Sequence, residues 1–278
     1  MKDNVHKGTM RTGFTYREIS VGNVFRAGSK DYNHLMFVLE GYINVTCNEF
    51  SYQMMHKGQF VLFPISADVL CRAVSNCRVL TFTFETLPES FNAACRSYAP
   101  KHVPAARTTL TTLPPVPLFD NFFDLLLVFL RDGLDEPIIH QIKGEELFIL
   151  LYSFYEMKYL YPLFQPVVSV YPDFRVKVMR SYRAISNVKE LSDAIGVETK
   201  TFYRRFKAEF DTSPCRWMLN QKARHIHFSL SESGLTLEDV RKKHGFKFSA
   251  HFTRFCREQL HCTPLQLRKK LQQRPSIT

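Results

Sequence analysis

Two groups of cationic and hydrogen-bonding side chains lie on segments with helical spacing near the C-terminus. They are Thr199, Lys200, Tyr203, Arg204 and Lys207 in the first group, and Lys247, Ser249, Ala250, His251 and Arg254 in the second. An arginine can donate two hydrogen bonds to a guanine edge, a lysine can contact a phosphate, and an alanine methyl can contact thymine. These residue types therefore predict recognition of double-stranded DNA.

Each group lies on the second helix of a predicted helix-turn-helix pair. In the first pair, Val188, Leu191 and Ile195 fall on one face of a helix, and Gly196 permits a tight turn with a positive φ. The second helix is predicted over 198–210. Its apolar stripe consists of Phe202, Phe206 and Phe210. In the second pair, Gly245 makes the turn and the inward side chains are Phe246, Phe252 and Phe255.

The two pairs are copies of one unit. Pro214 and Pro264 are 50 residues apart, and the same offset places Arg204 on Arg254. Upstream the offset becomes 49, so one extra residue lies in the second turn. A register kept over this many positions predicts an internal duplication. A single pair could be an amphipathic helix pair with a solvated cationic face, but two in tandem favour a DNA reader.

The charge is concentrated in the same part of the chain. Residues 166–278 contain 22 Lys and Arg against 10 Asp and Glu, whereas residues 1–165 contain 15 against 16. The net charge is therefore +12 for residues 166–278 and −1 for residues 1–165, which together give the total of +11. This asymmetry predicts a module that binds a polyanion, preceded by a nearly neutral module. The alternative interpretation is a basic surface with no ligand.

The spacing over residues 173–271 resembles the AraC/XylS family of bacterial transcription regulators. The resemblance rests on the Ile195-Gly196-Val197 turn, on Phe202-x-Arg204 and Phe252-x-Arg254, and on Ser213-Pro214 and Thr263-Pro264. It implies two helix-turn-helix subdomains joined by a long helix over about 214–230, with reading helices in successive major grooves about 34 Å apart. The departures from the family pattern are Asp211, Arg241, His244, Cys256, His261 and Leu267.

The N-terminal part is predicted to be strand-rich over about 14–98 and helical over about 118–161. The short β-branched and aromatic runs favour an antiparallel sandwich or barrel, and Gly58–Pro64 (GQFVLFP) resembles part of a cupin motif. Residues 1–165 are interpreted as a cupin-like sensing or dimerisation domain, which makes the chain α+β. A barrel could hold a small molecule or be filled by Phe37, Phe60, Leu62, Phe63, Phe82 and Phe84.

A helix predicted over about 140–161 is apolar nearly all round. It is either packed inside its own domain or a dimerisation face. Histidines His34 and His56 lie 22 residues apart without further ligands, so no metal and no cofactor are expected. The seven cysteines form no C-x-x-C pair, which is typical of a reducing compartment. With no secretory signal or spanning segment in the sequence, we expect a cytoplasmic bacterial protein without membrane contact.

The leading hypothesis is a sequence-specific DNA-binding transcription regulator and not an enzyme. Its expected partners are promoter or operator DNA, RNA polymerase, a second copy of the chain and a small-molecule effector. One alternative is a cupin-type metal-dependent enzyme with a helical appendage. The other is a protein that binds DNA without sequence preference.

Overall fold

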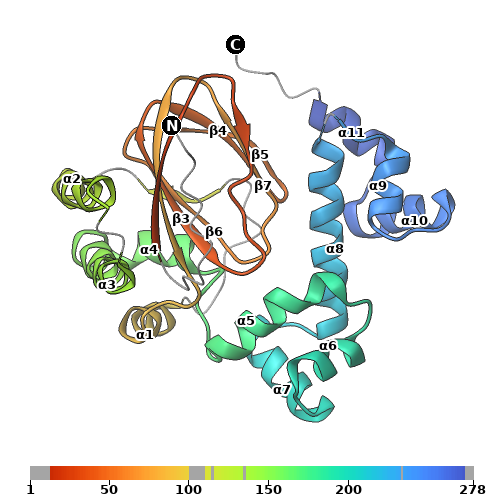
Figure 1. Cartoon of the computed structure of the whole chain (residues 1–278). Coiled ribbons are helices and arrows are strands. Elements are labelled where there is room, and N and C mark those ends of the chain that lie inside the picture. The colour runs from red at the N-terminus through yellow and green to blue at the C-terminus, as the bar shows by residue number, and fades with distance from the viewer. Residues whose placement is uncertain (1–12, 100–109, 114–115, 134–135, 233, 273–278) are drawn as a thin grey trace.

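A computed structural model describes residues 13–99, 110–113, 116–133, 136–232 and 234–272. Two antiparallel sheets and several helices form the N-terminal part, and the C-terminal part is entirely helical (Figure 1). The predicted α+β class is therefore confirmed. Among the described helices, none has the length and apolar composition needed to cross a lipid bilayer.

Short strands alternate with turns along this part of the chain, as the sequence predicts. They are β1 (Gly13–Ile19), β2 (Val24–Phe25), β3 (Asn33–Glu40), β4 (Tyr42–Cys47), β5 (Phe50–His56), β6 (Phe60–Phe63), β7 (Val69–Ala73), β8 (Cys77–Phe84) and β9 (Thr112–Leu113). The larger sheet has the order β1-β8-β3-β6-β9 and the smaller has the order β2-β7-β4-β5. No ladder between the described strands joins the two sheets, so they form an open sandwich and are not closed into the predicted barrel.

The larger sheet is buried on both faces. Met36, Val38 and Phe63 point toward the smaller sheet, whereas Phe37 and Phe82 point toward the helices. This double burial explains the uninterrupted apolar run in β3, because alternating residues serve two different cores. The phenylalanines predicted to fill a barrel are therefore divided: Phe63 lies between the sheets, and the others pack under the helices.

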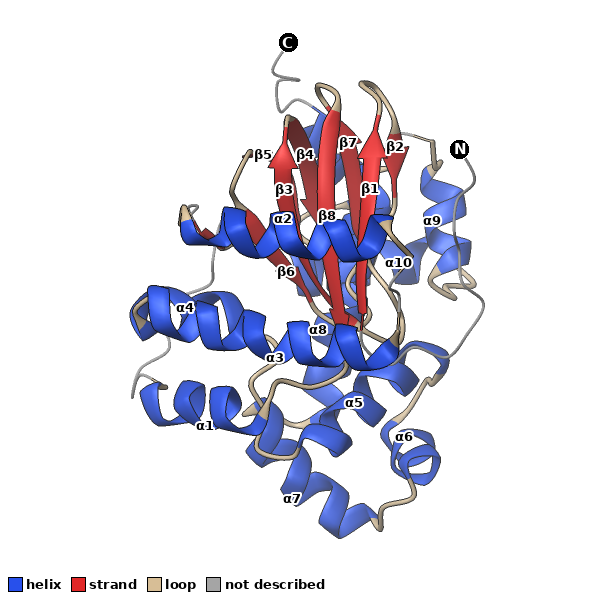
Figure 2. Ribbon diagram, turned by 60° about the vertical axis from the view of Figure 1, so that its left-hand side comes forward, coloured by secondary structure: helices blue, strands red, loops and turns tan. Residues whose placement is uncertain are grey.

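Four described helices belong to the N-terminal part; the second and third lie across the outer face of the larger sheet (Figure 2), and the first packs against the third and fourth. They are α1 (Glu89–Tyr98), α2 (Leu118–Arg131), α3 (Pro137–Phe154) and α4 (Met157–Phe164). Two expectations need correction. The strand-rich region predicted to about 98 ends with β8 at Phe84 and is followed by α1, with the short β9 after it, and the helix predicted over 140–161 is broken into α3 and α4 at Tyr155 and Glu156.

A glycine allows α3 to approach the sheet closely. A Cβ atom on Gly144 would lie 2.5 Å from Cζ of Phe82, well inside van der Waals contact. Any side chain at this position would push the helix away from β8. Glycine costs helix stability, so its presence here is explained by this contact.

The C-terminal part follows the predicted order of helices. They are α5 (Pro172–Ser181), the short 3₁₀ helix η1 (Tyr182–Ala184), α6 (Val188–Ile195), α7 (Thr199–Phe210), α8 (Pro214–Ser231), α9 (Leu237–Lys243), α10 (Ser249–Leu260) and α11 (Pro264–Gln272). Pro172 and Pro264 occupy the first turns of α5 and α11, where the missing N–H has no helical partner. Pro162, in contrast, lies inside α4 and does not mark the linker.

Candidate DNA-binding interface

Each helix-turn-helix unit has its own apolar core, and α8 contributes to both. The first core contains Phe174, Val178, Tyr182, Leu191, Ile195, Phe202, Phe206 and Trp217. The second contains Ile226, Leu230, Val240, Phe252, Cys256, Leu267 and Leu271. Because Trp217 near the start of α8 belongs to one core and Leu230 near its end to the other, the helix fixes the spacing of the two units (Figure 1).

In the first unit, local capping and core packing turn α7 outward. The side chain of Asn187 accepts a hydrogen bond from the Glu190 N–H and begins α6. Gly196 ends this helix with φ 73°, a conformation that residues with a Cβ rarely adopt. Phe202 and Phe206 are then fully buried. The opposite face of α7 is therefore left to solvent.

The second unit repeats this construction with different capping residues. Thr236 and Asp239 form a reciprocal capping box at the start of α9. Gly245 adopts φ 74° in the turn, as the sequence predicts from its alignment with Gly196. Phe252 and Cys256 occupy the buried face of α10. Cys256 thus takes the core position that Phe206 fills in the first unit.

An arginine ties the second unit together at its turn. Arg241 pairs with Glu238 at 2.6 Å on its own helix. Its guanidinium also donates hydrogen bonds to the backbone carbonyl oxygens of Phe246 and Lys247. Arg241 stands where the AraC/XylS pattern favours a small residue, and these bonds explain how the larger side chain is accommodated. It fixes the segment that leads into α10.

Two departures from the resembled family occupy left-handed backbone positions. Asp211 follows α7 with φ 51°, and His261 follows α10 with φ 57°. A glycine would adopt these angles without strain, whereas Asp and His are among the other residues that tolerate them. The family pattern places glycine here because the backbone is left-handed, and in this chain Asp211 and His261 adopt the same conformation at a higher cost.

Every predicted DNA-contacting residue lies on the surface. Thr199, Lys200, Tyr203, Arg204, Lys207, Lys247, Ser249, Ala250, His251 and Arg254 are all exposed. Lys207 contacts Asp211 at 3.1 Å, and Arg254 lies 4.0 Å from Glu258. Exposed pairs of this kind contribute about 0–1 kcal/mol, so both cations can exchange their carboxylates for phosphates at little cost.

The histidines weighed as metal ligands lie at strand ends. His56 is the last residue of β5 and is exposed, and His34 is the second residue of β3. Burial, together with the charge of Arg17, lowers the pKa of His34 to about 4, so this ring is neutral at pH 7. Across the described residues, no three His, Cys, Asp or Glu side chains are grouped so that they could hold a metal ion.

A half-buried polar cluster joins the sheets to the C-terminal helical part, and sequence reasoning missed it. Nδ1 of His225 on α8 lies 2.6 Å from Oδ2 of Asp68, and Arg183 lies 3.0 Å from the other oxygen. The hydroxyl of Tyr182 lies 2.7 Å from Nε2 of His225. Burial opposes ionisation of Asp68, but the hydrogen bond from His225 and the charge of Arg183 outweigh it and lower its pKa to about 2. A charged Asp68 therefore holds the two parts together.

The contact between the sheets and the C-terminal helices, called the joint below, includes further ion pairs along α8 and α5. They are Arg224 with Glu49 at 3.2 Å, Arg180 with Glu85 at 3.0 Å, and Arg26 with Glu232. Each pairs a carboxylate with a cation from the other side of the joint. The excess charge of residues 166–278 is thus used in part for contact within the chain.

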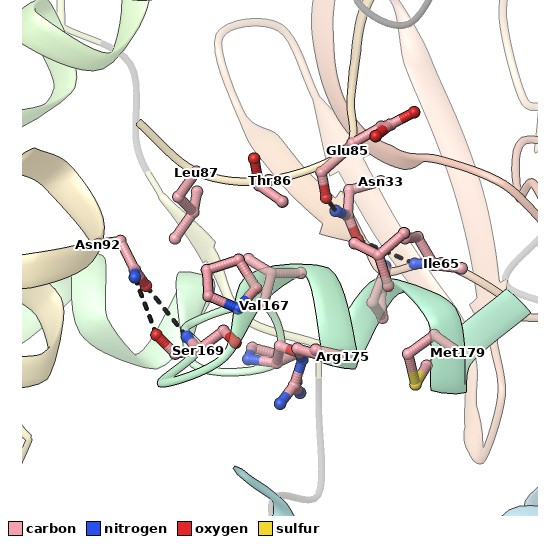
Figure 3. A pocket seen from close by; sticks show the side chains of 14 residues that line it. Asn33, Ile65, Glu85, Thr86, Leu87, Asn92, Val167, Ser169, Arg175 and Met179 are labelled. Atoms are coloured by element: carbon pink, nitrogen blue, oxygen red, sulfur yellow. Dashed lines mark hydrogen bonds between the residues drawn. The ribbon is translucent and has the colours of Figure 1, made fainter. Parts of the chain in front are cut away.

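The linker is held from both sides. The Asn92 side chain accepts a hydrogen bond from the Ser169 N–H and donates one to the Ser169 carbonyl, at 3.0 and 2.9 Å (Figure 3). Glu209 on the rear of α7 accepts hydrogen bonds from the N–H groups of Val170 and Tyr171, both at 2.9 Å. The segment between the two parts therefore connects α1 directly to α7.

Residues 191–270 match the family model described as a helix-turn-helix domain. These residues therefore form a helix-turn-helix domain. The match confirms the predicted domain type, a tandem helix-turn-helix segment of the kind that binds DNA. It covers both turns and the helices α7 and α10 described above.

Several solved structures match the chain at low sequence identity. A variant of apo ToxT from Vibrio cholerae shares 11% identity, with a TM-score of 0.44, over 96% of this chain and 100% of that one. An AraC-type regulator from Chromobacterium violaceum shares 20% over 37% of this chain and 96% of that one, with a TM-score of 0.34. A cupin 2 conserved barrel domain protein from Leptotrichia buccalis shares 10% sequence identity over 27% of this chain and 36% of that one, with a TM-score of 0.26. No protein with a curated description matches the chain in sequence.

Proposed function

We propose that the chain is a sequence-specific regulator that reads promoter DNA with α7 and α10 in successive major grooves. The observation that carries this proposal is the division of both helices into a buried apolar stripe and an exposed polar face. Successive major grooves on one side of a duplex are about 34 Å apart, and α8 sets the spacing of the two helices. Its partners are then operator DNA in the bacterial cytoplasm and RNA polymerase at the promoter. This function needs no catalytic step.

The side chains divide into base readers and phosphate contacts. Arg204 and Arg254 occupy equivalent positions on the two helices and are long enough to reach guanine edges. Lys200 and Lys207 flank Arg204 and suit phosphates. Ala250 offers a methyl group that fits beside thymine. This assignment predicts two recognition elements of different sequence, because the two helices present different side chains.

Replacement of Arg204 by alanine is expected to weaken binding to the preferred DNA sequence by about 1–3 kcal/mol and to relax the preference at one base pair. The DNA is first selected from a random library with the wild-type protein, and affinity is then measured by gel-shift titration. Arg96→Ala, a change at an exposed position of α1, is the matched control and should leave affinity unchanged.

An unchanged affinity for Arg204→Ala, with a wild-type circular dichroism spectrum, would reject the placement of this residue at the bases. A wild-type protein that binds selected and random DNA equally well would instead support the hypothesis of binding without sequence preference. The same titrations therefore separate the two DNA-binding functions.

The outer face of α3 supports self-association. Four large apolar residues recur along one side of this helix and are more than half exposed. They are Ile138, Ile142, Ile149 and Tyr152, with exposures of 58%, 57%, 64% and 54%. Leu125 and Val128 are exposed on the neighbouring α2. A stripe of this kind on the surface is typical of a protein interface, and we propose that it pairs with the same stripe of a second copy.

Ile149→Glu is expected to weaken self-association by at least about tenfold, because it places a charge in the apolar interface and each copy of a symmetric dimer carries the change. Analytical ultracentrifugation over a range of protein concentrations measures this effect. Val74→Glu, at an exposed position in the turn after β7, is the matched control. Equal sedimentation of wild type and Ile149→Glu at every concentration would contradict the proposed interface.

Effector sensing stays a prediction. A signal from the N-terminal part would reach the DNA-binding helices through the contact between the sheets and the helices α5 and α8. A cavity of about 20 Å³ lies there, lined by residues that include Asn33, Glu85, Ser169 and Arg175 (Figure 3). This volume suits a water molecule, whereas small-molecule sites occupy about 300–1,000 Å³. A ligand in this cavity would therefore have to separate α5 from the sheets, which would move the linker and, through Glu209, α7. A more open hollow of about 470 Å³ lies at the same junction, lined by residues that include Asp31, Tyr32, Lys177 and Arg180, and it is large enough for a small molecule.

A further inference from the structure

Phe248 is an exposed aromatic residue at the entrance to the second reading helix. Its side chain is 63% exposed, which places it among the most exposed large apolar residues of the described chain. The neighbouring Phe246 and Phe252 pack into the second core, with ring centroids 5.3 Å apart. Phe248 has no place in this core. Its apolar ring is therefore not explained by the folding of the unit.

Helix capping does not explain this residue either. Phe248 is the N-cap of α10 and makes no side-chain capping hydrogen bond. Ser, Thr, Asp and Asn are strongly preferred at this position because their oxygen accepts a bond from the first turn. The equivalent position of the first unit, 50 residues earlier, is Glu198, whose carboxylate accepts a hydrogen bond from Thr201. A polar residue would stabilise α10 better than phenylalanine does.

The ring of Phe248 lies beside a residue of the predicted reading face. Its centroid is 5.6 Å from that of His251, and the two rings are at 80°. The backbone before it is fixed, since Arg241 donates hydrogen bonds to the carbonyl oxygens of Phe246 and Lys247. The ring is thus held at the start of α10 next to exposed Lys247, Ser249 and His251.

We propose that Phe248 reads a thymine, by contact between its ring and the C5 methyl group in the major groove. This inference rests on the proposed function, in which α10 enters that groove. The thymine methyl is the apolar feature of the major groove, and apolar side chains recognise it by contact. The adjacent Lys247 suits a phosphate, so this end of α10 offers one charged and one apolar contact to the same duplex. In the free protein the ring is exposed to water, and on binding it would be buried against the methyl group, which favours the complex.

The test replaces individual thymines of the selected DNA by deoxyuridine, which removes the methyl group and keeps every hydrogen bond. Wild-type protein is expected to lose about fourfold in affinity at one thymine in the half-site bound by the second unit, the value of one buried methyl-sized group. Phe248→Ser is expected to bind the thymine-containing DNA about fourfold more weakly and to be insensitive to deoxyuridine at that position. Phe248→Leu keeps an apolar side chain and should keep most of the sensitivity.

Thermal unfolding of Phe248→Ser separates this role from a structural one, because serine is the better N-cap and the variant should be at least as stable as wild type. Phe248→Ser that still distinguishes thymine from deoxyuridine at every sensitive position would overturn the proposal. So would a wild-type protein that tolerates deoxyuridine throughout the selected DNA. A failure of the proposed function looks different, because wild-type protein would then select no DNA sequence at all.

Discussion

Replacement of Phe206 by alanine is expected to destabilise the first helix-turn-helix unit by about 3–5 kcal/mol. The Phe206 ring is fully buried and lies at the centre of an aromatic cluster. Its centroid is 5.4 Å from that of Phe202, 4.4 Å from that of Phe210 and 5.6 Å from that of Trp217. Truncation removes the transfer free energy of the ring and leaves a cavity among side chains that cannot collapse into it.

Tryptophan fluorescence during denaturant unfolding measures this effect locally, because Trp217 is the single tryptophan of the chain and belongs to the same core. Phe206→Leu is the matched control and should cost much less, since leucine refills part of the space. Cys256→Ala changes the equivalent position of the second unit and should leave the Trp217 transition in place. An unshifted Trp217 transition in Phe206→Ala would contradict the packing described for the first core.

The helix-turn-helix units could be predicted from the sequence because their determinants are local. Gly196 and Gly245 mark turns that need a positive φ, and both adopt it. The spacing of Phe202 and Phe206 defines the buried side of α7, so the exposed side follows from helical geometry. The same reasoning gave Phe248 no role, because the sequence alone does not show that its ring is exposed.

The N-terminal part was predicted less well for a physical reason. Both faces of β3 are buried, so the run from Leu35 to Leu39 has no polar alternation to show which residues face which core. The helix α1 was missed because it is short and mixed in composition. The break between α3 and α4 comes where the backbone of Tyr155 and Glu156 turns to extended angles, although the helical spacing of apolar residues continues on both sides.

The joint could not be predicted from sequence because its partners are far apart along the chain. Asp68 and His225 are separated by 157 positions, and Ser66 and Arg183 by 117. Nothing in the sequence next to these residues distinguishes them from other polar positions. Only the fold brings them together, and with them the connection from the sheets through the linker to α7.

DNA binding is expected to weaken about 1,000-fold when the salt concentration rises from 50 to 200 mM, a dependence typical of proteins that contact about six phosphates. The exposed Lys200, Lys207 and Lys247 lie on or next to the two reading helices and supply part of this number. Each phosphate contact releases condensed counterions from the duplex, so the logarithm of the affinity falls linearly with the logarithm of salt concentration. Fluorescence anisotropy with the selected DNA measures the slope.

Lys207→Gln is expected to reduce the magnitude of this slope by about one while leaving the preferred sequence unchanged, because phosphate contacts position the protein without reading bases. Lys158→Gln, on α4 of the N-terminal part, is the matched control and should keep the wild-type slope. A wild-type affinity that hardly changes between the two salt concentrations would mean that the exposed cations of α7 and α10 do not lie against the duplex. The charge of residues 166–278 would then serve the joint with the sheets, through pairs such as Arg183 with Asp68 and Arg224 with Glu49.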